Sequence, residues 1–382
     1  YLPAQFLNPR VNLRDDDYGG SLDNRLRFLR RAIAACRGEI GLVGLRISGD
    51  EKDPEGLSEP ETLEAIAALA PDLDYVNVIA GTSASHAGAV HIVPPMSIET
   101  AYVAPFAAAV KARVDTAVFV AGRINQPQIA EQVLASNQAD MCGMTRAMIC
   151  DPRMADKART GHAEDIRACI GCNQACIGHF QKGEAISCIQ YPETGRELRY
   201  GTLEPAGRPR KIMVVGGGPG GMKAAAVAAA RGHAVSLFEA TGRLGGQALL
   251  AQLLPGRAEF GGIVTNLSRE VELAGVALRL NSTVDKALIE AEAPDAVILA
   301  TGATPHWPEI EGAEEAHVVD AWQVLTGEAN VGGAVVVADW ACDWIGMGIA
   351  EKLARDGCHV RPAVTGFVSG QRMPSYVRGR KS

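Results

Sequence analysis

The 382-residue sequence lacks the features that identify several classes of protein. Its net charge is −7 with both signs interspersed, so it has no basic stripe that would bind nucleic acid. It has no run of about 18 apolar residues, the length that crosses a bilayer. Residues 1–10 lack the charged and apolar regions of a secretion signal, so export is not expected. We therefore predict a cytoplasmic protein that acts on a small molecule and contacts neither nucleic acid nor membrane.

Disulfide-like spacing is missing at five of the nine cysteines. At this length two or more domains are expected, and the composition leaves the oligomeric state open, a homo-oligomer included. The five scattered cysteines are expected to be reduced thiols packed as small hydrophobic side chains: Cys36, Cys142, Cys150, Cys342 and Cys358.

The other four cysteines lie within 20 residues, at the spacing C-x2-C-x3-C-x11-C. They are Cys169, Cys172, Cys176 and Cys188. Thiolates bind zinc or iron–sulfur clusters, and three close cysteines with a more distant fourth are typical of a cluster. Structural zinc usually takes two C-x2-4-C pairs, and the second pair is missing here. We predict a [4Fe-4S] cluster, with zinc and uncoordinated or disulfide-bonded thiols as the alternatives.

Before these cysteines, short apolar segments alternate with helical patterns. After a loop over residues 1–20, Ser21 is expected to cap the first helix. Such alternation predicts parallel βα units, and four units are half of a (β/α)8 barrel. We expect strands over residues 42–47, 75–79, 117–121 and 140–144, and helices over 59–69, 99–111 and 127–135 and from about residue 151.

Glycine and arginine follow the third and fourth of these strands. Gly122 and Arg123 come after the third strand, and Gly143, Thr145 and Arg146 lie at the end of the fourth. A barrel binds phosphate at the loops after its last two strands. Glycine lets backbone N–H groups approach an anion, and arginine can chelate it. The pattern predicts a phosphate site, with turn glycines and surface arginines as the alternative.

After a polar linker over residues 196–211, a second domain begins. An apolar strand leads into Gly216, Gly218 and Gly221, a helix follows, and the next strand ends at Glu239. This is the complete dinucleotide fingerprint, in which the glycines admit a pyrophosphate and the acid binds a ribose hydroxyl. Gly246 and Gln247 continue the same domain.

A second strand–turn–helix unit, at residues 335–355, lacks the fingerprint. Aligned on its strand, the three glycine positions hold Ala338, Trp340 and Asp343. Bulk and negative charge would stand where the pyrophosphate binds. We therefore expect this unit to bind a nicotinamide dinucleotide poorly.

The order of these parts, together with residues 1–9, 17–25 and 169–173, resembles the iron–sulfur flavoproteins of the Old Yellow Enzyme superfamily, which include trimethylamine dehydrogenase, 2,4-dienoyl-CoA reductase and the N-demethylases of dimethylglycine and N-methylproline. The resemblance implies an α/β chain whose cofactors are FMN, a [4Fe-4S] cluster and FAD or ADP. Residues 1–165 would form the C-terminal half of the TIM barrel and bind FMN, and the front half, with the family's catalytic tyrosine and a neighbouring histidine, would lie upstream of Tyr1. Residues 166–210 would hold the cluster and a linker, and residues 211–382 a Rossmann-like FAD/NAD(P)-binding domain that is incomplete at its C-terminus.

The same resemblance assigns roles to single residues. Arg46 is similar to the family arginine beside flavin N1 and O2, with a surface ion pair as the alternative. His86 and His91 lie in the loop where the dienoyl-CoA reductases carry an acid–base histidine, and either could equally be a solvated loop residue. The remaining matches are Gly122, Arg123, Gly143, Thr145 and Arg146 for the FMN phosphate, and Gly216, Gly218, Gly221 and Glu239 for the second dinucleotide.

Three functions fit these features. The first is an amine dehydrogenase or N-demethylase that passes electrons through the cluster to a protein such as an electron-transferring flavoprotein. The second is an NADPH-dependent 2,4-dienoyl-CoA or enoate reductase. The third is a non-catalytic protein with structural zinc and passively bound ADP. We favour the first, because Trp340 and Asp343 disfavour a nicotinamide donor.

Overall fold

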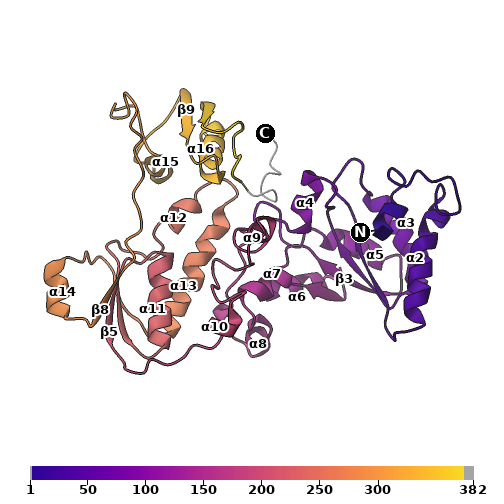
Figure 1. Cartoon of the computed structure of the whole chain (residues 1–382), viewed down its shortest axis with the longest axis horizontal. Coiled ribbons are helices and arrows are strands. Elements are labelled where there is room, and N and C mark those ends of the chain that lie inside the picture. Colours follow the sequence, from indigo (N-terminus) through magenta and orange to yellow (C-terminus); the bar gives the residue numbers. More distant parts are fainter. Residues whose placement is uncertain (1, 374–382) are drawn as a thin grey trace. The chain divides into compact units, whose positions relative to one another are not determined.

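The computed structural model describes residues 2–373, which form two compact units (Figure 1). The described part of the first unit comprises residues 2–159 and 173–186. That of the second unit comprises residues 160–172 and 187–373. Along the cysteine segment the chain thus passes from the second unit to the first and back. The domain boundaries expected from the sequence, near residues 165 and 210, stay a prediction.

The first unit is an alternating α/β structure with one parallel sheet in the strand order β1-β2-β3-β4. This order agrees with the consecutive βα units expected from the sequence and confirms the α/β fold class with parallel sheets. The strands are β1 (Gly44–Ser48), β2 (Tyr75–Ile79), β3 (Ala117–Ala121) and β4 (Met141–Gly143), and the longer helices are α2 (Leu22–Arg37), α3 (Glu59–Leu69), α5 (Ala104–Lys111) and α6 (Pro127–Ala135).

The two faces of this sheet differ because successive side chains of a strand point to opposite sides. On one face Val76, Val78, Val118 and Val120 are fully buried. They belong to one apolar core with side chains of α3 and α5. The other face carries polar groups and the stacked rings of Tyr75 and Phe119, whose centroids are 4.8 Å apart. The apolar core therefore covers one face of the sheet. The opposite face is available for a functional site.

The chain begins with a helix where a loop was expected. Helix α1 (Leu2–Leu7) lies within the predicted loop over residues 1–20. Its Phe6 ring stacks on Phe28 of α2 at 4.5 Å, and Leu7 is buried. These contacts join residues far apart in the sequence, so local composition did not indicate the helix. The next prediction is confirmed, because the Ser21 hydroxyl accepts a hydrogen bond from the Asn24 N–H and caps α2.

Two other helix boundaries differ from the expectation. The helix expected over 99–111 begins at Ala104, after a turn. The helix expected from about residue 151 begins at Met154 as α8 (Met154–Arg159), and α7 (Thr145–Cys150), which was not expected, precedes it. Asp151 is extended between them, as the residue before a proline prefers to be, and Pro152 follows it.

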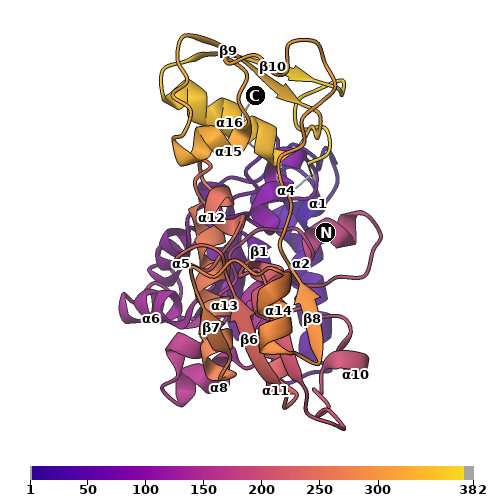
Figure 2. The ribbon, with the colours of Figure 1, turned by 90° about the vertical axis from the view of Figure 1, so that its left-hand side faces the viewer.

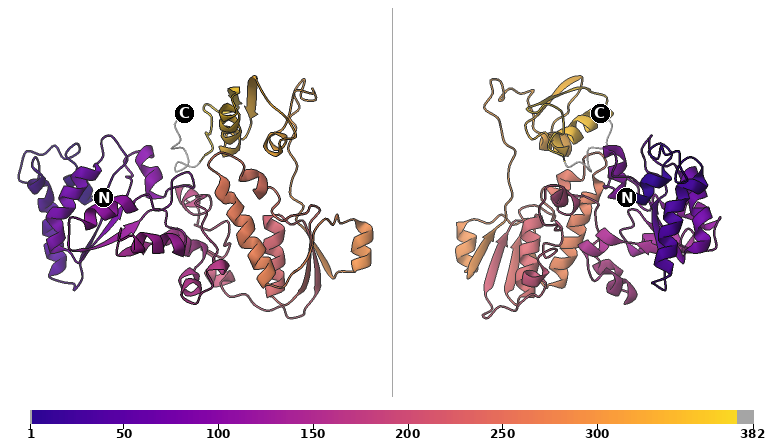
Figure 3. Two further views of the ribbon diagram at one scale, coloured as in Figure 1. Left: turned by 180° about the vertical axis from the view of Figure 1, so that it is seen from behind. Right: turned by 45° about the vertical axis from the view of Figure 1, so that its right-hand side comes forward.

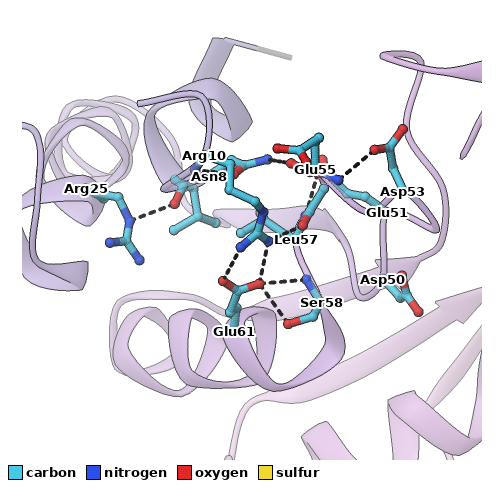
Figure 4. Close-up of polar contacts among 12 residues, drawn as sticks. Asn8, Arg10, Arg25, Asp50, Glu51, Asp53, Glu55, Leu57, Ser58 and Glu61 are labelled. Atoms are coloured by element: carbon cyan, nitrogen blue, oxygen red, sulfur yellow. Dashed lines mark hydrogen bonds and ion pairs between the residues drawn. The ribbon is translucent and has the colours of Figure 1, made fainter. Parts of the chain in front are cut away.

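An ion pair ties the N-terminal segment to α3 (Figure 4). Arg10 donates to both carboxylate oxygens of Glu61, at 3.0 and 2.8 Å. One of these oxygens also accepts from the N–H and the hydroxyl of Ser58, which completes a capping box at the start of the helix. The hydrogen bond from Arg10 is the main reason that the pKa of Glu61 falls from 4.5 to about 2.

The pair predicts a pH-dependent contribution to stability. The folded-state pKa of Glu61 lies below its unfolded value, so the contribution is present above about pH 4.5 and is lost as the pH falls toward 2. At pH 7 we expect Glu61→Gln to lower the free energy of unfolding by about 1 to 2 kcal/mol, a value reduced because the pair is partly exposed to solvent. Urea unfolding at pH 7 and pH 3 measures this. The exposed Glu64→Gln on the same helix is the control, and a Glu61→Gln deficit that is equal at both pH values would contradict the prediction.

The second unit contains two parallel sheets. The first has the strand order β7-β6-β5-β8, and α11 (Pro219–Ala230) and α14 (Lys286–Glu292) cover its opposite faces (Figures 1 and 3). The second sheet pairs β9 with β10, and helix α16 (Trp344–Arg355) packs against it (Figure 2). The strands are β5 (Lys211–Val215), β6 (Ala234–Phe238), β7 (Ala277–Arg279), β8 (Ala296–Leu299), β9 (Ala334–Asp339) and β10 (His359–Val364).

The remaining helices are short, apart from α13 (Gly261–Leu273), which packs beside α11. Between residues 2 and 373, no helix combines the length and the apolar character needed to cross a membrane. The remaining short helices are α4 (His86–Ile92), α9 (Ile177–Gln181), α10 (Glu197–Tyr200), α12 (Ala248–Ala251) and α15 (Ala321–Thr326).

Candidate functional site

The polar face of the first sheet carries Arg46. This residue is the third of the five in β1, a strand that was expected over residues 42–47 and spans Gly44–Ser48. It lies opposite Asn77 of β2 in the register, and its guanidinium donates to the Asn77 side-chain oxygen at 2.9 Å. The side chain is exposed on the sheet face that the apolar core leaves open. Such a cation suits a ring that gains negative charge when it is reduced.

The two candidate histidines lie on helix α4. The prediction that they lie in a loop was wrong. Ser85 caps this helix by accepting from the Gly88 N–H. His86 is exposed at the first position of the helix, whereas His91 is partly buried near its end. The Nδ1 atom of His91 is buried without a hydrogen-bond partner, and burial, with nearby Lys52, lowers the pKa of His91. Of the two histidines, only His91 is partly buried in the unit, where its surroundings favour the neutral imidazole.

Tyr102 was missed by the sequence analysis. Its hydroxyl donates to the backbone carbonyl of His91 at 2.7 Å, and the two rings lie 5.7 Å apart. A Cβ placed on Gly122 would stand 3.2 Å from the Tyr102 ring. Burial raises the pKa of Tyr102, so the phenol stays protonated. No spacing in the sequence indicated this neighbourhood, because it forms only when the connection between β2 and β3, which carries His91 and Tyr102, packs beside the residue that follows β3.

The predicted phosphate residues fall into two groups. Arg146 donates to the side-chain oxygen of Asn173 at 2.7 Å, and Asn173 in turn donates to the Val93 carbonyl at 2.7 Å. Arg123 has a left-handed backbone, is buried and directs its guanidinium to the Ile98 carbonyl. Gly122 and Gly143 lie at the ends of β3 and β4, and Thr145 is exposed at the start of α7.

These donors are compatible with FMN. Arg46 and Arg146 supply cations on the first unit, and Asn173 holds one of them in a fixed orientation. The buried Arg123 serves the fold through Ile98, and its contact with a phosphate stays a prediction. The FMN roles of the glycines and of Thr145 also stay predictions.

The local geometry of the cysteine segment suits thiolate ligands. The N–H of Gly171 points to the Cys169 sulfur at 3.5 Å, and such contacts stabilise a thiolate. Gly171 and Asn173, on either side of Cys172, both have left-handed backbones, which turn the chain sharply around that residue. Cys169, Cys172, Cys176 and Cys188 are all partly buried. Four thiol donors within 20 residues of the sequence are the donor set of an iron–sulfur cluster.

The first turn of the second unit forms a glycine-lined cradle. A Cβ on Gly246 would lie 3.0 Å from the Gly218 Cα, and one on Gly221 would lie 1.9 Å from the Gly216 carbonyl oxygen. Gly218 is the N-cap of α11, so no side chain covers the first amides of this twelve-residue helix. The cradle fits a pyrophosphate at the helix N-terminus.

The predicted acid of this cradle is in place. Glu239 follows β6 and accepts from the Gly217 N–H at 2.7 Å and from the Thr241 N–H at 2.8 Å. Burial opposes ionisation, but these hydrogen bonds outweigh it and lower the pKa of Glu239. Gln247 lies behind the cradle and donates to the Ala303 carbonyl at 3.1 Å.

The second turn is filled by the chain itself. Asp343 is the N-cap of α16 and accepts from the Ile345 N–H at 2.8 Å, so it corresponds to Gly218. The alignment on the strand had put it at the third glycine, a position that the structure gives to Gly346. A Cβ on Gly346 would lie 2.3 Å from the carboxyl carbon of Asp339, which accepts from the Cys342 N–H at 2.9 Å. Two carboxylates therefore occupy the place of an anionic ligand.

Two family models match the chain. Residues 1–165 match the NADH:flavin oxidoreductase / NADH oxidase family, and residues 210–359 match the pyridine nucleotide-disulphide oxidoreductases.

The chain is 37% identical to the N,N-dimethylglycine/sarcosine dehydrogenase of Chromohalobacter salexigens, over 99% of this chain and 57% of that enzyme. It is also 37% identical to a probable N-methylproline demethylase of Rhizobium meliloti, over 94% of this chain and 54% of that protein. A solved structure of a 2-naphthoyl-CoA reductase superposes with a TM-score of 0.90 at 29% identity, over 99% of this chain and 58% of that one. The chain thus spans between half and three-fifths of these relatives.

Proposed function

The chain belongs to the NADH:flavin oxidoreductase / NADH oxidase family, in the Old Yellow Enzyme superfamily, and we propose that it serves an FMN- and [4Fe-4S]-dependent oxidation of an N-methylated amine or amino acid. Relatives that act on dimethylglycine, sarcosine and N-methylproline support this substrate class. The observation that carries the choice is the second turn, where Asp339 and Asp343 occupy the anion position. Amine oxidation needs no nicotinamide donor.

Four side chains of the first unit have a defined role in this proposal. FMN, when bound, would accept a hydride from the N-methyl carbon. Arg46 would lie beside its pyrimidine edge and stabilise the negative charge of the reduced ring. Arg146, held by Asn173, would bind the phosphate. His91 is the better of the two histidine candidates for a proton acceptor near the substrate, because its imidazole is neutral and faces inward.

The cluster would serve electron transfer, and a nucleotide would bind the second unit. Cys169, Cys172, Cys176 and Cys188 would hold a [4Fe-4S] cluster, which supplies one-electron transfer. FAD or ADP would bind the cradle at Gly218, with Glu239 on a ribose hydroxyl. We place the enzyme in the cytoplasm, where thiols stay reduced, and expect its electron acceptor to be a protein similar to an electron-transferring flavoprotein.

A second candidate is an NADPH-dependent 2,4-dienoyl-CoA or enoate reductase. Its support is the similarity to a 2-naphthoyl-CoA reductase structure, which covers almost the whole chain.

Anaerobic mixing of the holoenzyme with substrates tests the proposal. Dimethylglycine, sarcosine or N-methylproline is expected to bleach the flavin absorbance within the dead time of manual mixing, while the unmethylated glycine and proline leave it unchanged. Bleaching by none of the N-methyl compounds, together with reoxidation of the reduced flavin by an enoyl thioester, would favour the reductase instead.

A further inference from the structure

A polar network in the second unit joins the two ends of the cysteine segment. Gln190 lies two residues after Cys188 and is only 4% exposed. Its side-chain nitrogen donates to the carbonyl of Ala168, the residue before Cys169, at 2.9 Å. The side-chain nitrogen of Asn266 donates to the Gln190 side-chain oxygen at 2.6 Å and to the Ala168 carbonyl at 3.3 Å. The flanks of the first and the fourth cysteine are therefore bonded to each other and to α13.

A charged contact one helical turn further along α13 holds the same two flanks. Arg167 pairs with Glu270 at 2.7 Å, and Lys223 of α11 pairs with the other oxygen of Glu270 at 2.9 Å. The Arg167 guanidinium also lies over the Tyr191 ring, 4.7 Å from its centroid. These charged side chains are only 13 to 21% exposed, so solvent screens the pairs weakly. Both flanks are thus fixed to a regular helix.

We propose that Gln190 and Asn266 are positioning residues for the metal site, and the inference rests on the proposed [4Fe-4S] cluster. Eleven residues separate Cys188 from the third cysteine, so its approach to the other thiolates carries a loop-closure cost. The bonds to the Ala168 carbonyl hold its flank next to Cys169 and so reduce that cost. Neither side chain is a ligand, and both act through the backbone around the cysteines.

The shared acceptor gives this network a measurable signature. A carbonyl oxygen has two lone pairs, and Gln190 and Asn266 both donate to the one at Ala168. Asn266 also orients Gln190, so loss of either side chain weakens the contact made by the other. Residues that share a hydrogen-bond network do not contribute additively. The effects of the two substitutions should therefore add to more than the effect of the double variant.

The test uses Gln190→Met, Asn266→Leu and the double variant, purified anaerobically, with the exposed Thr265→Ala on the same helix as the control. Release of iron to a chelator is followed by the loss of visible absorbance. Each single variant is expected to release iron about tenfold faster than the wild type, as is common when a residue behind a metal ligand is removed. The electron paramagnetic resonance spectrum of the reduced cluster should also change in both variants and stay unchanged in Thr265→Ala.

The outcomes separate the inference from the proposed cluster. Wild-type protein without iron would refute the cluster and the positioning role together. Wild-type protein with a full cluster, and variants that keep its release rate and its resonance spectrum, would refute the positioning role alone. If Asn266→Leu does not fold, Asn266→Asp keeps the shape of the side chain but donates neither bond, and the same two results apply to it.

Discussion

NADPH is expected to reduce the holoenzyme at least about 100-fold more slowly than dimethylglycine does, because an uncompensated charge beside a buried anion costs about 3 kcal/mol. The reason is the second turn of the second unit. Asp343 caps α16 where the first turn has a glycine, and Asp339 fills the space in front of Gly346. A pyrophosphate placed there would meet two carboxylates. Stopped-flow mixing with each donor, followed at the flavin absorbance maximum, measures the two rates.

A charge-neutral variant tests this reason directly. Asp343→Asn keeps an oxygen that can cap α16 but removes the charge, and Asp339→Asn keeps an acceptor for the Cys342 N–H and removes the second charge. The double variant is expected to bind NADPH at least about tenfold more tightly than the wild type, since a charge contact of this kind is worth roughly 1.4 kcal/mol or more. Asp356→Asn, at the other end of the helix, removes one such charge and serves as the control. Fast reduction of the wild type by micromolar NADPH would contradict the assignment of this turn.

Replacement of Cys172 by alanine is expected to abolish the iron–sulfur cluster. Anaerobically prepared wild-type protein should contain about four irons and four sulfides, and the variant should lose them together with the broad visible absorbance, because three thiolates and a tight backbone do not replace the missing ligand. Iron and sulfide analysis measures the loss. Cys36→Ala is the matched control, since Cys36 is exposed on α2 and lies outside the motif.

Two results of this experiment would contradict the cluster. Unchanged iron content in Cys172→Ala would mean that the metal lies elsewhere. Stoichiometric zinc in the wild type, with no iron, would instead support a structural metal and a non-catalytic role for this segment.

Local signals were sufficient for the elements whose cause lies within a few residues. Helix α3 begins after Ser58, with Pro60 in its first turn and a capping box, and its bounds agree with the prediction. Strands β2 and β3 are short apolar runs between loops and were also predicted with the correct bounds. The glycine fingerprint is equally local, because each glycine is required by a turn or a close approach in the same strand–turn–helix unit.

The candidate site depended on contacts that no local pattern contains. His91 is distinguished from His86 only by its burial beside Tyr102, which lies eleven residues later in the same connection between β2 and β3. The structure places Asp343 at the helix cap and not at the third glycine position, because the second turn is longer than the first. The length of that turn depends on how Asp339 packs against Gly346.

The cysteine spacing by itself indicated a metal, since ligand identity and spacing are properties of the chain. Only the tertiary structure decided that Gln190 and Asn266 hold the first and fourth cysteine flanks together, because hydrogen bonds between residues 22 and 76 positions apart exist only after the chain has folded.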